Sequence, residues 1–171
     1  VNFRVALEKE GMKPDTVHHH LSYLKSLYLF AQRENITKDH LLRNLKPPKQ
    51  TKKEVLFLSA EEVERLLEIL DPYNYAPVFI ALETGMRKGE VLNLRFSWVD
   101  FSTGYINIPA EFTKGNYRRN VPMGDDLKDY IDQLREKATD KDGFVVSPDG
   151  GHTKRQDVKV GLKTAFKKIG R

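Results

Sequence analysis

Apolar residues recur at helical spacing in the segment that follows Pro14. They lie three or four positions apart and are Val17, Leu21, Leu24, Tyr28 and Ala31. Pro14, Asp15 and Thr16 are typical residues for the start of a helix. The opposite face carries His18, His19, Lys25 and Arg33. The pattern therefore predicts an amphipathic helix with one apolar face over about four turns.

A shorter helix is predicted from Thr37, which can act as an N-cap, to Leu45, because Pro47 and Pro48 cannot continue it. The stretch KPPKQTKKEV follows, and its basic residues are Lys46, Lys49, Lys52 and Lys53. This polar, proline-containing composition is typical of a linker. We therefore place a domain boundary near residue 50, between a small helical module, residues 1–50, and a larger domain, residues 51–171.

The larger domain alternates between helical and strand patterns. Ser59 and Glu62 form a capping-box signature for a first helix, residues 76–84 predict a more buried helix that ends before Gly85, and Met86–Leu94 predicts a third. Three short antiparallel strands are expected within 98–101, 105–112 and 118–123, because glycine turns separate them. Further helices are predicted over 125–138 and 157–169, with a short strand in FVVSP between them. The predicted fold class is mixed α/β, mainly helical.

Charge and composition narrow the possible functions. The 171 residues include no cysteine, carry a formal net charge of +5 and contain 39% hydrophobic residues. A thiolate metal site and a disulfide framework are therefore excluded, and a reducing cytosol is expected. No apolar run approaches the about 18 residues that a membrane span needs, so no membrane association is expected. Residues 1–50 hold nine Lys and Arg against five Asp and Glu, so the basic excess lies mainly in the small module. This excess of basic residues is compatible with a polyanionic partner.

Arg87 is the first candidate for chemistry. It lies in the stretch ETGMRKGEVLNLR, after a glycine turn and at the start of a predicted helix. Helix N-termini favour phosphate, and the guanidinium fork can hold two phosphate oxygens. Glu90, three positions further on, lies on the same helical face and can orient the arginine by an ion pair. An ordinary surface ion pair between Arg87 and Glu90 is the alternative.

Lys114 is the second candidate, in the glycine-flanked turn FTKGN between two predicted strands. An ammonium group at an exposed turn can reach a phosphate and can give a proton to a leaving alkoxide. A solvated turn lysine is the alternative. The consecutive His18, His19 and His20 point about 100° apart on a helix, so they cannot share one metal ion, and no metal site is expected.

The two stretches occur together and in order. The string TGMRKGEVLNL, then three predicted strands, then TKGNYRRNVPM resembles the start of the catalytic domain of the tyrosine recombinases, the phage integrase family. The linker, the LSAEEVERLL opening and the TVHHHLSYLKSL helix of residues 16–27 also resemble this family, with its core-binding domain before the catalytic domain. The resemblance covers nearly the whole chain.

The resemblance implies a site-specific recombinase that breaks and rejoins double-stranded DNA through a 3′-phosphotyrosine, without a cofactor. Arg87 would grip the scissile phosphate with support from Glu90, and Lys114 would protonate the leaving 5′ oxygen. Further DNA contacts are expected from His19, Lys25, Lys52, Lys53, Lys88, Arg118 and Arg119. A homotetramer on DNA for the full-length protein, a cytoplasmic location and a bacterial or phage origin are also implied.

Three features depart from the family pattern. The HTKR string, His152–Arg155, has H-x-x-R spacing, but it precedes the helix that comes before this motif in the family. No tyrosine follows Tyr130, and Tyr117 is better placed to stack on DNA or on its neighbouring strand. We expect a fragment that begins inside the core-binding domain, is truncated at its C-terminus and is inactive by itself. There are two alternatives. The first is a non-catalytic DNA-binding or regulatory module, and the second is a helical interaction protein that does not bind DNA.

Overall fold

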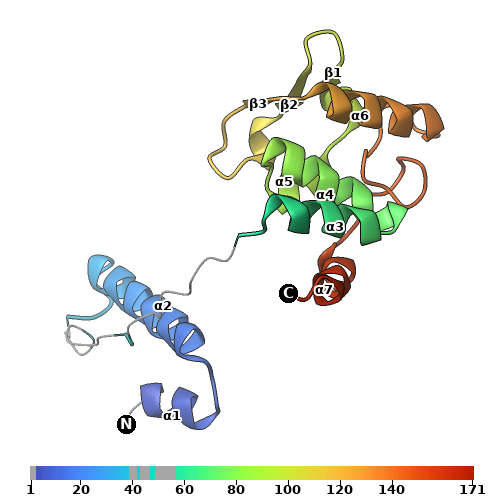
Figure 1. Cartoon of the computed structure of the whole chain (residues 1–171). Helices are drawn as coiled ribbons and strands as arrows, with labels where there is room; N and C mark the ends of the chain where they lie inside the picture. Colours follow the sequence, from blue (N-terminus) through green and yellow to red (C-terminus); the bar gives the residue numbers. More distant parts are fainter. Residues whose placement is uncertain (1–2, 39–41, 43–46, 49–56) are drawn as a thin grey trace. The chain divides into compact units, whose positions relative to one another are not determined.

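The computed structural model describes residues 3–38, 42, 47, 48 and 57–171 (Figure 1). The chain divides into two compact units, Val1–Phe57 and Leu58–Arg171. Most of the helix predicted over Thr37–Leu45 lies outside the described residues, as do the linker lysines Lys46, Lys49, Lys52 and Lys53. No helix in the described part of the chain is long and apolar enough to cross a membrane.

The first unit contains two helices, α1 (Phe3–Lys9) and α2 (Pro14–Arg33). The bounds of α2 confirm the predicted amphipathic helix. Its buried residues Val17 and Leu21 pack with Leu7 of α1. Helix α1 was not predicted, because two turns are too short for a clear periodicity and its first turn has no acidic residue.

The second unit combines five helices with one sheet among its residues, 58–171. The helices are α3 (Ala60–Ile69), α4 (Pro72–Thr84), α5 (Lys88–Asn93), α6 (Asp125–Lys137) and α7 (Lys159–Lys168). The strands are β1 (Val99–Asp100), β2 (Tyr105–Ile108) and β3 (Arg119–Pro122), which form an antiparallel sheet in the order β1-β2-β3. Two 3₁₀ turns, η1 (Phe96–Trp98) and η2 (Ala110–Phe112), flank the strands. The predicted mixed α/β class, mainly helical, is confirmed.

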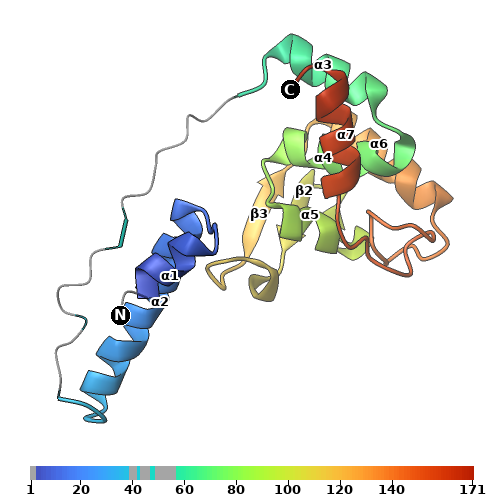
Figure 2. The ribbon, with the colours of Figure 1, turned by 90° about the horizontal axis from the view of Figure 1, so that it is seen from below.

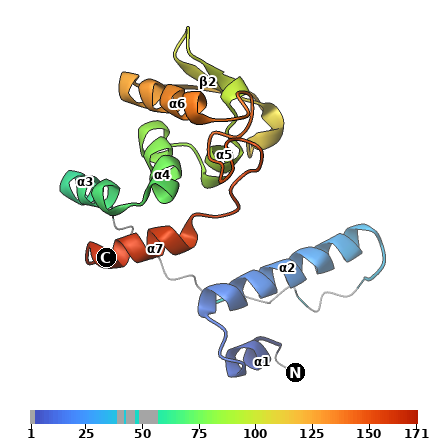
Figure 3. The ribbon, with the colours of Figure 1, turned by 90° about the vertical axis from the view of Figure 1, so that its right-hand side faces the viewer.

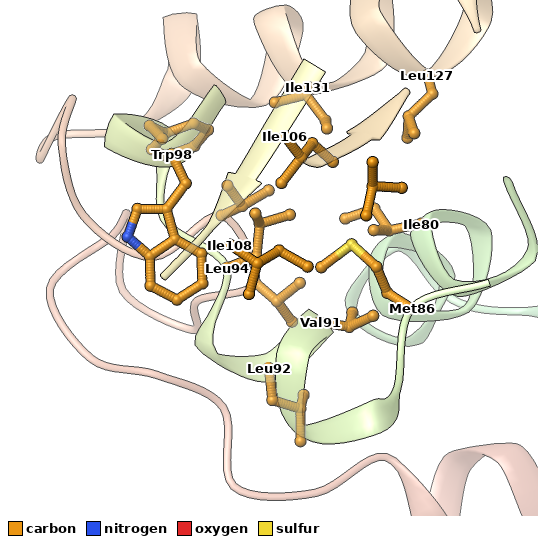
Figure 4. Packing of buried hydrophobic residues seen from close by; sticks show 14 of the residues in the cluster. Ile80, Met86, Val91, Leu92, Leu94, Trp98, Ile106, Ile108, Leu127 and Ile131 are labelled. Atoms are coloured by element: carbon orange, nitrogen blue, oxygen red, sulfur yellow. The ribbon is translucent and has the colours of Figure 1, made fainter. Parts of the chain in front are cut away.

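One face of the sheet supplies the main core. Ile106 pairs with Val121 across β2 and β3, and Ile108 pairs with Arg119. Residues of α4, α5 and α6 cover this face (Figure 4), and the fully buried members include Ile80, Leu94 and Ile131. Trp98 lies in the same core and its ring contacts Phe112. The core therefore joins α5 to the sheet, and both carry candidate residues.

A smaller core holds α7 against the other helices. Leu66 of α3, Val78 of α4 and Ala165 of α7 are buried together. Figures 2 and 3 show α7 beside α3 at the end of the unit away from the sheet. Arg171 adds a two-pronged ion pair to Glu62, with N···O distances of 2.7 and 2.9 Å. Helix α7 is thus packed onto the unit rather than projecting from it.

Several predicted boundaries were wrong. Strand β2 ends at Ile108 rather than at residue 112, because Pro109 cannot donate to the ladder and η2 follows. The FVVSP segment is no strand in the structure, which shows one bridge there, between Arg95 and Phe144. Helices α5 and α7 each begin two residues later than predicted. The predicted β2 strand included the residues of η2, and the predicted starts of α5 and α7 included their N-caps, Arg87 and Val158.

Candidate active site

The buried carboxylate of Glu90 is the centre of the candidate site. Its side chain is 2% exposed and lies on α5. The Oε1 atom accepts a hydrogen bond from Nη1 of Arg87 at 3.1 Å. The Oε2 atom accepts from the backbone N–H of Arg87 at 2.8 Å and from Nη2 of Arg119 at 3.0 Å. Charge-assisted bonds of this kind offset the cost of burying a carboxylate.

The local fold presents Arg87 to solvent. Gly85 ends α4 with a left-handed φ of 61°, which glycine adopts at little cost. The chain then turns, and Arg87 is the extended N-cap of α5 with φ of −68° and ψ of 149°. Its side chain remains 55% exposed. Since a guanidinium has five N–H donors and Glu90 takes one, the others have no hydrogen-bond partner among the described residues and can bind an anion.

Arg119 approaches Glu90 from the sheet. It is the first residue of β3, and its side chain is 29% exposed, less than that of Arg87. Besides the bond to Glu90, its buried Nε has no hydrogen-bond partner among the described residues. The sequence predicted the pair Arg87–Glu90 but missed Arg119 as the second partner. The only available signal was its position in a strand that follows the Lys114 segment.

Lys114 lies in the connection between β2 and β3, and this connection ends at Arg119. The connection is longer than the tight turn that was predicted. The Thr113 hydroxyl donates to the Tyr117 carbonyl at 2.8 Å and accepts from its backbone N–H at 3.1 Å, which closes the loop around Lys114. Lys114 is exposed, and its ammonium has no ion pair among the described residues. It is therefore free to meet an external acceptor.

The other predicted DNA contacts have different surroundings. Lys88 forms an ion pair with Asp157 at 3.2 Å. Arg118 is exposed and lines a surface hollow of about 540 Å³ with Asn107 and Asn120. His19 stacks on Tyr23 within α2 of the first unit, which also carries Lys25. Lys52 and Lys53 lie outside the described residues. The structure brings together the side chains of Arg87, Glu90 and Arg119. The ammonium group of Lys88 pairs with Asp157 instead of joining them.

Arg155 of the HTKR string has a structural environment. It is 5% exposed, its Nη1 and Nη2 donate to the Tyr73 carbonyl and to Oδ1 of Asn74, and its guanidinium lies 3.7 Å from the centroid of the Tyr73 ring. His152 is exposed and contacts the Thr139 hydroxyl at 3.0 Å. Arg155 thus attaches the loop before α7 to the start of α4. This agrees with the expectation that the string is not the family motif.

Tyr130 and Tyr117, the two tyrosines discussed from the sequence, both pack against neighbouring groups in the structure. Tyr130 of α6 packs against Tyr75 and Phe79 of α4, at ring-centroid distances of 5.5 and 5.2 Å. Burial raises its pKa to about 12, with a smaller contribution from Tyr75. The Tyr117 ring is exposed but lies over Gly115, so closely that a Cβ there would overlap it.

Histidines do not assemble into a metal site in the described residues, where no cluster of three His, Cys, Asp or Glu side chains occurs. The rings of His18 and His19 are nearly perpendicular, with an interplanar angle of 88°. Nδ1 of His18 contacts the Pro48 carbonyl at 2.8 Å within the first unit.

Known proteins resemble this chain in sequence. The model of the phage integrase family matches residues 56–171, and the chain belongs to this family. It is 30% identical over 169 residues to tyrosine recombinase XerD of Oceanobacillus iheyensis. The matched region covers 91% of this chain and 56% of that protein. Tyrosine recombinase XerC of the same species is 28% identical and covers 98% of this chain and 57% of that protein. The chain therefore spans a little over half the length of these relatives.

Solved structures share the fold. A λ integrase (75–356) dimer bound to a COC′ core site has a TM-score of 0.75 at 15% identity, over 98% of this chain and 60% of that chain. The integrase of mycobacterium phage Brujita has a TM-score of 0.56 at 22% identity, over 97% of this chain and 56% of that chain.

Proposed function

We propose that these residues belong to a site-specific DNA recombinase, in which Arg87 holds the scissile phosphate. The observation that supports this role is the division of its donors. One side-chain N–H is bound to the buried Glu90, and the remaining ones have no partner among the described residues, on a side chain that is 55% exposed. A guanidinium oriented in advance loses little freedom when it meets a phosphate that gains charge in the transition state. The family membership of residues 56–171 adds the reaction class.

Lys114 is the proposed general acid. Its ammonium is exposed and unpaired among the described residues, so it can give its proton to the leaving 5′ oxygen once DNA covers it. A tyrosine hydroxyl attacks the phosphorus, the P–O5′ bond breaks, and the 3′-phosphotyrosine retains the energy for rejoining. The arginine and the lysine carry this chemistry without a cofactor. Function as a DNA-bound homotetramer, in the cytoplasm, belongs to the same proposal for the full-length protein.

These 171 residues are proposed not to form the covalent intermediate by themselves. The last tyrosine, Tyr130, is packed between aromatic rings, and its raised pKa disfavours the phenolate. Tyr117 is exposed, but its ring is held over Gly115. The chain nevertheless contains the proposed phosphate-binding and proton-donating residues, so DNA binding can be tested with it directly.

The test measures binding of the 171-residue chain to a mixed-sequence 30-base-pair duplex by fluorescence anisotropy between 50 and 200 mM salt. Each phosphate contact contributes about 0.9 to the slope of log K against log salt. We expect a linear, steep decrease for the native chain and a slope that is smaller by about 0.9 for Arg87→Ala. Arg65→Ala is the matched control, because Arg65 is exposed on α3, away from the Glu90 cluster.

Failure to bind at low salt, or an unchanged slope for Arg87→Ala, would contradict the proposal. A slope that decreases equally for Arg65→Ala would show general charge attraction instead of a phosphate site at Arg87.

A further inference from the structure

The two oxygens of Glu90 are used differently. Oε1 is bound by the Arg87 guanidinium, whereas Oε2 is shared between the Arg87 backbone N–H and the Arg119 guanidinium. Glu90 and Arg119 are 29 positions apart, on α5 and β3. The carboxylate thus has two cationic partners from separate elements, and only one of them is mostly exposed.

Removal of Arg119 would leave a buried carboxylate with one cation. Arginine forks bind both oxygens of a carboxylate through two parallel N–H bonds when both oxygens are accessible. Arg87 is the cation already in contact, so it would turn a second N–H onto Oε2. The donors that now face solvent would then point toward Glu90, and their capacity for a phosphate would decrease.

We propose that Arg119 is a positioning residue that keeps Arg87 available for phosphate by occupying Oε2 of Glu90. This inference rests on the proposed function, since it concerns the same phosphate-binding arginine. The position of Arg119 supports it, because β3 begins at this residue and the connection that carries Lys114 ends there. The bond to Glu90 therefore also attaches that connection to α5.

The experiment compares salt slopes for the same 30-base-pair duplex. We expect Arg119→Ala to lower the slope by about 0.9 through the loss of the Arg87 contact, without a contribution from a DNA contact of Arg119 itself. Arg119→Lys should restore the native slope, because one ammonium N–H can replace the single N–H that Arg119 gives to Glu90. The decisive variant combines Arg119→Ala with Glu90→Gln. A neutral amide at position 90 no longer captures Arg87. The salt slope of this double variant should therefore equal the slope of Glu90→Gln alone.

Each other outcome overturns the inference. A purely structural role predicts a lower melting temperature for Arg119→Ala with an unchanged slope, and circular dichroism at the assay temperature verifies that the variants are folded. If Arg119 contacts DNA directly, adding Glu90→Gln to Arg119→Ala will not restore the salt slope. The double variant Arg87→Ala with Arg119→Ala will then have a slope smaller than the native one by about 1.8. If Arg87→Ala itself has no effect, the proposed function fails; if only Arg119→Ala has none, this inference alone fails.

Discussion

Arg87 and Arg155 have the same side chain, and their surroundings assign them opposite roles. Arg87 is held by one N–H and is 55% exposed, whereas Arg155 is 5% exposed and donates to a backbone carbonyl and a side-chain amide of α4. Sequence spacing predicted the Arg87–Glu90 pair because the two residues are one helical turn apart. It could not predict the partners of Arg155, which are about 80 positions away.

Replacement of Arg155 should therefore affect stability and not DNA binding. Arg155→Ala leaves the part-buried Tyr73 carbonyl and the buried Oδ1 of Asn74 without their donor, and a buried group left unsatisfied costs about 1–3 kcal/mol. We expect a lower midpoint of urea unfolding and an unchanged salt slope of DNA binding. His152→Ala, at the exposed end of the same string, should change neither. A reduced salt slope for both variants would instead assign the string to the DNA-binding site.

At the level of elements, local signals predicted the start of α3 and the end of α4. The capping box of α3 was predicted from Ser59 and Glu62, and the structure confirms both of its hydrogen bonds, with N···O distances of 2.8 and 3.3 Å. The same Glu62 also binds Arg171, 109 positions away. One carboxylate thus caps α3 and ties it to Arg171, three residues beyond the end of α7 at Lys168, and only the cap is visible in the sequence.

Acid should weaken this attachment. Hydrogen bonds from Arg171, and then from the Ser59 backbone, lower the pKa of Glu62 from 4.5 to about 2. Because the folded-state pKa is depressed, the contribution to stability is present above pH about 4.5 and is lost as the pH falls towards 2. We expect the free energy of unfolding to decrease over this window, and the decrease to be smaller in Glu62→Gln. Equal pH profiles for both proteins, measured by urea denaturation, would contradict this expectation.

At the scale of the whole molecule, the two units have separate cores. Leu7, Val17 and Leu21 form one core, and the core around Ile106 belongs to residues 58–171. The family model matches residues 56–171, so the candidate catalytic residues lie in the matched unit. The proposed division of labour is a small helical module before a larger unit that carries Arg87 and Lys114.

Incubation of the 171-residue chain with a pool of nicked, sequence-randomised duplexes should give no covalent protein–DNA product on a denaturing gel. The physical reason is that Tyr130 is packed in an aromatic cluster with a pKa raised to about 12. An adduct would contradict the proposed inactivity. Its loss in Tyr117→Phe, but not in Tyr130→Phe, would identify the exposed tyrosine as the nucleophile. DNA binding without an adduct is also expected of a non-catalytic DNA-binding module.

Although α1 was missed and FVVSP was wrongly assigned to a strand, the sequence by itself determined α2, α3 with its cap, and the end of α4. These features depend on residues within about one helical turn or one strand alternation, so spacing and residue type suffice to predict α2, α3 and the end of α4 at Gly85. Only the tertiary structure decided that Glu90 is shared with Arg119 and that Arg155 is buried. These contacts join elements distant in the chain, and they depend on strand register and core packing, to which the whole unit contributes.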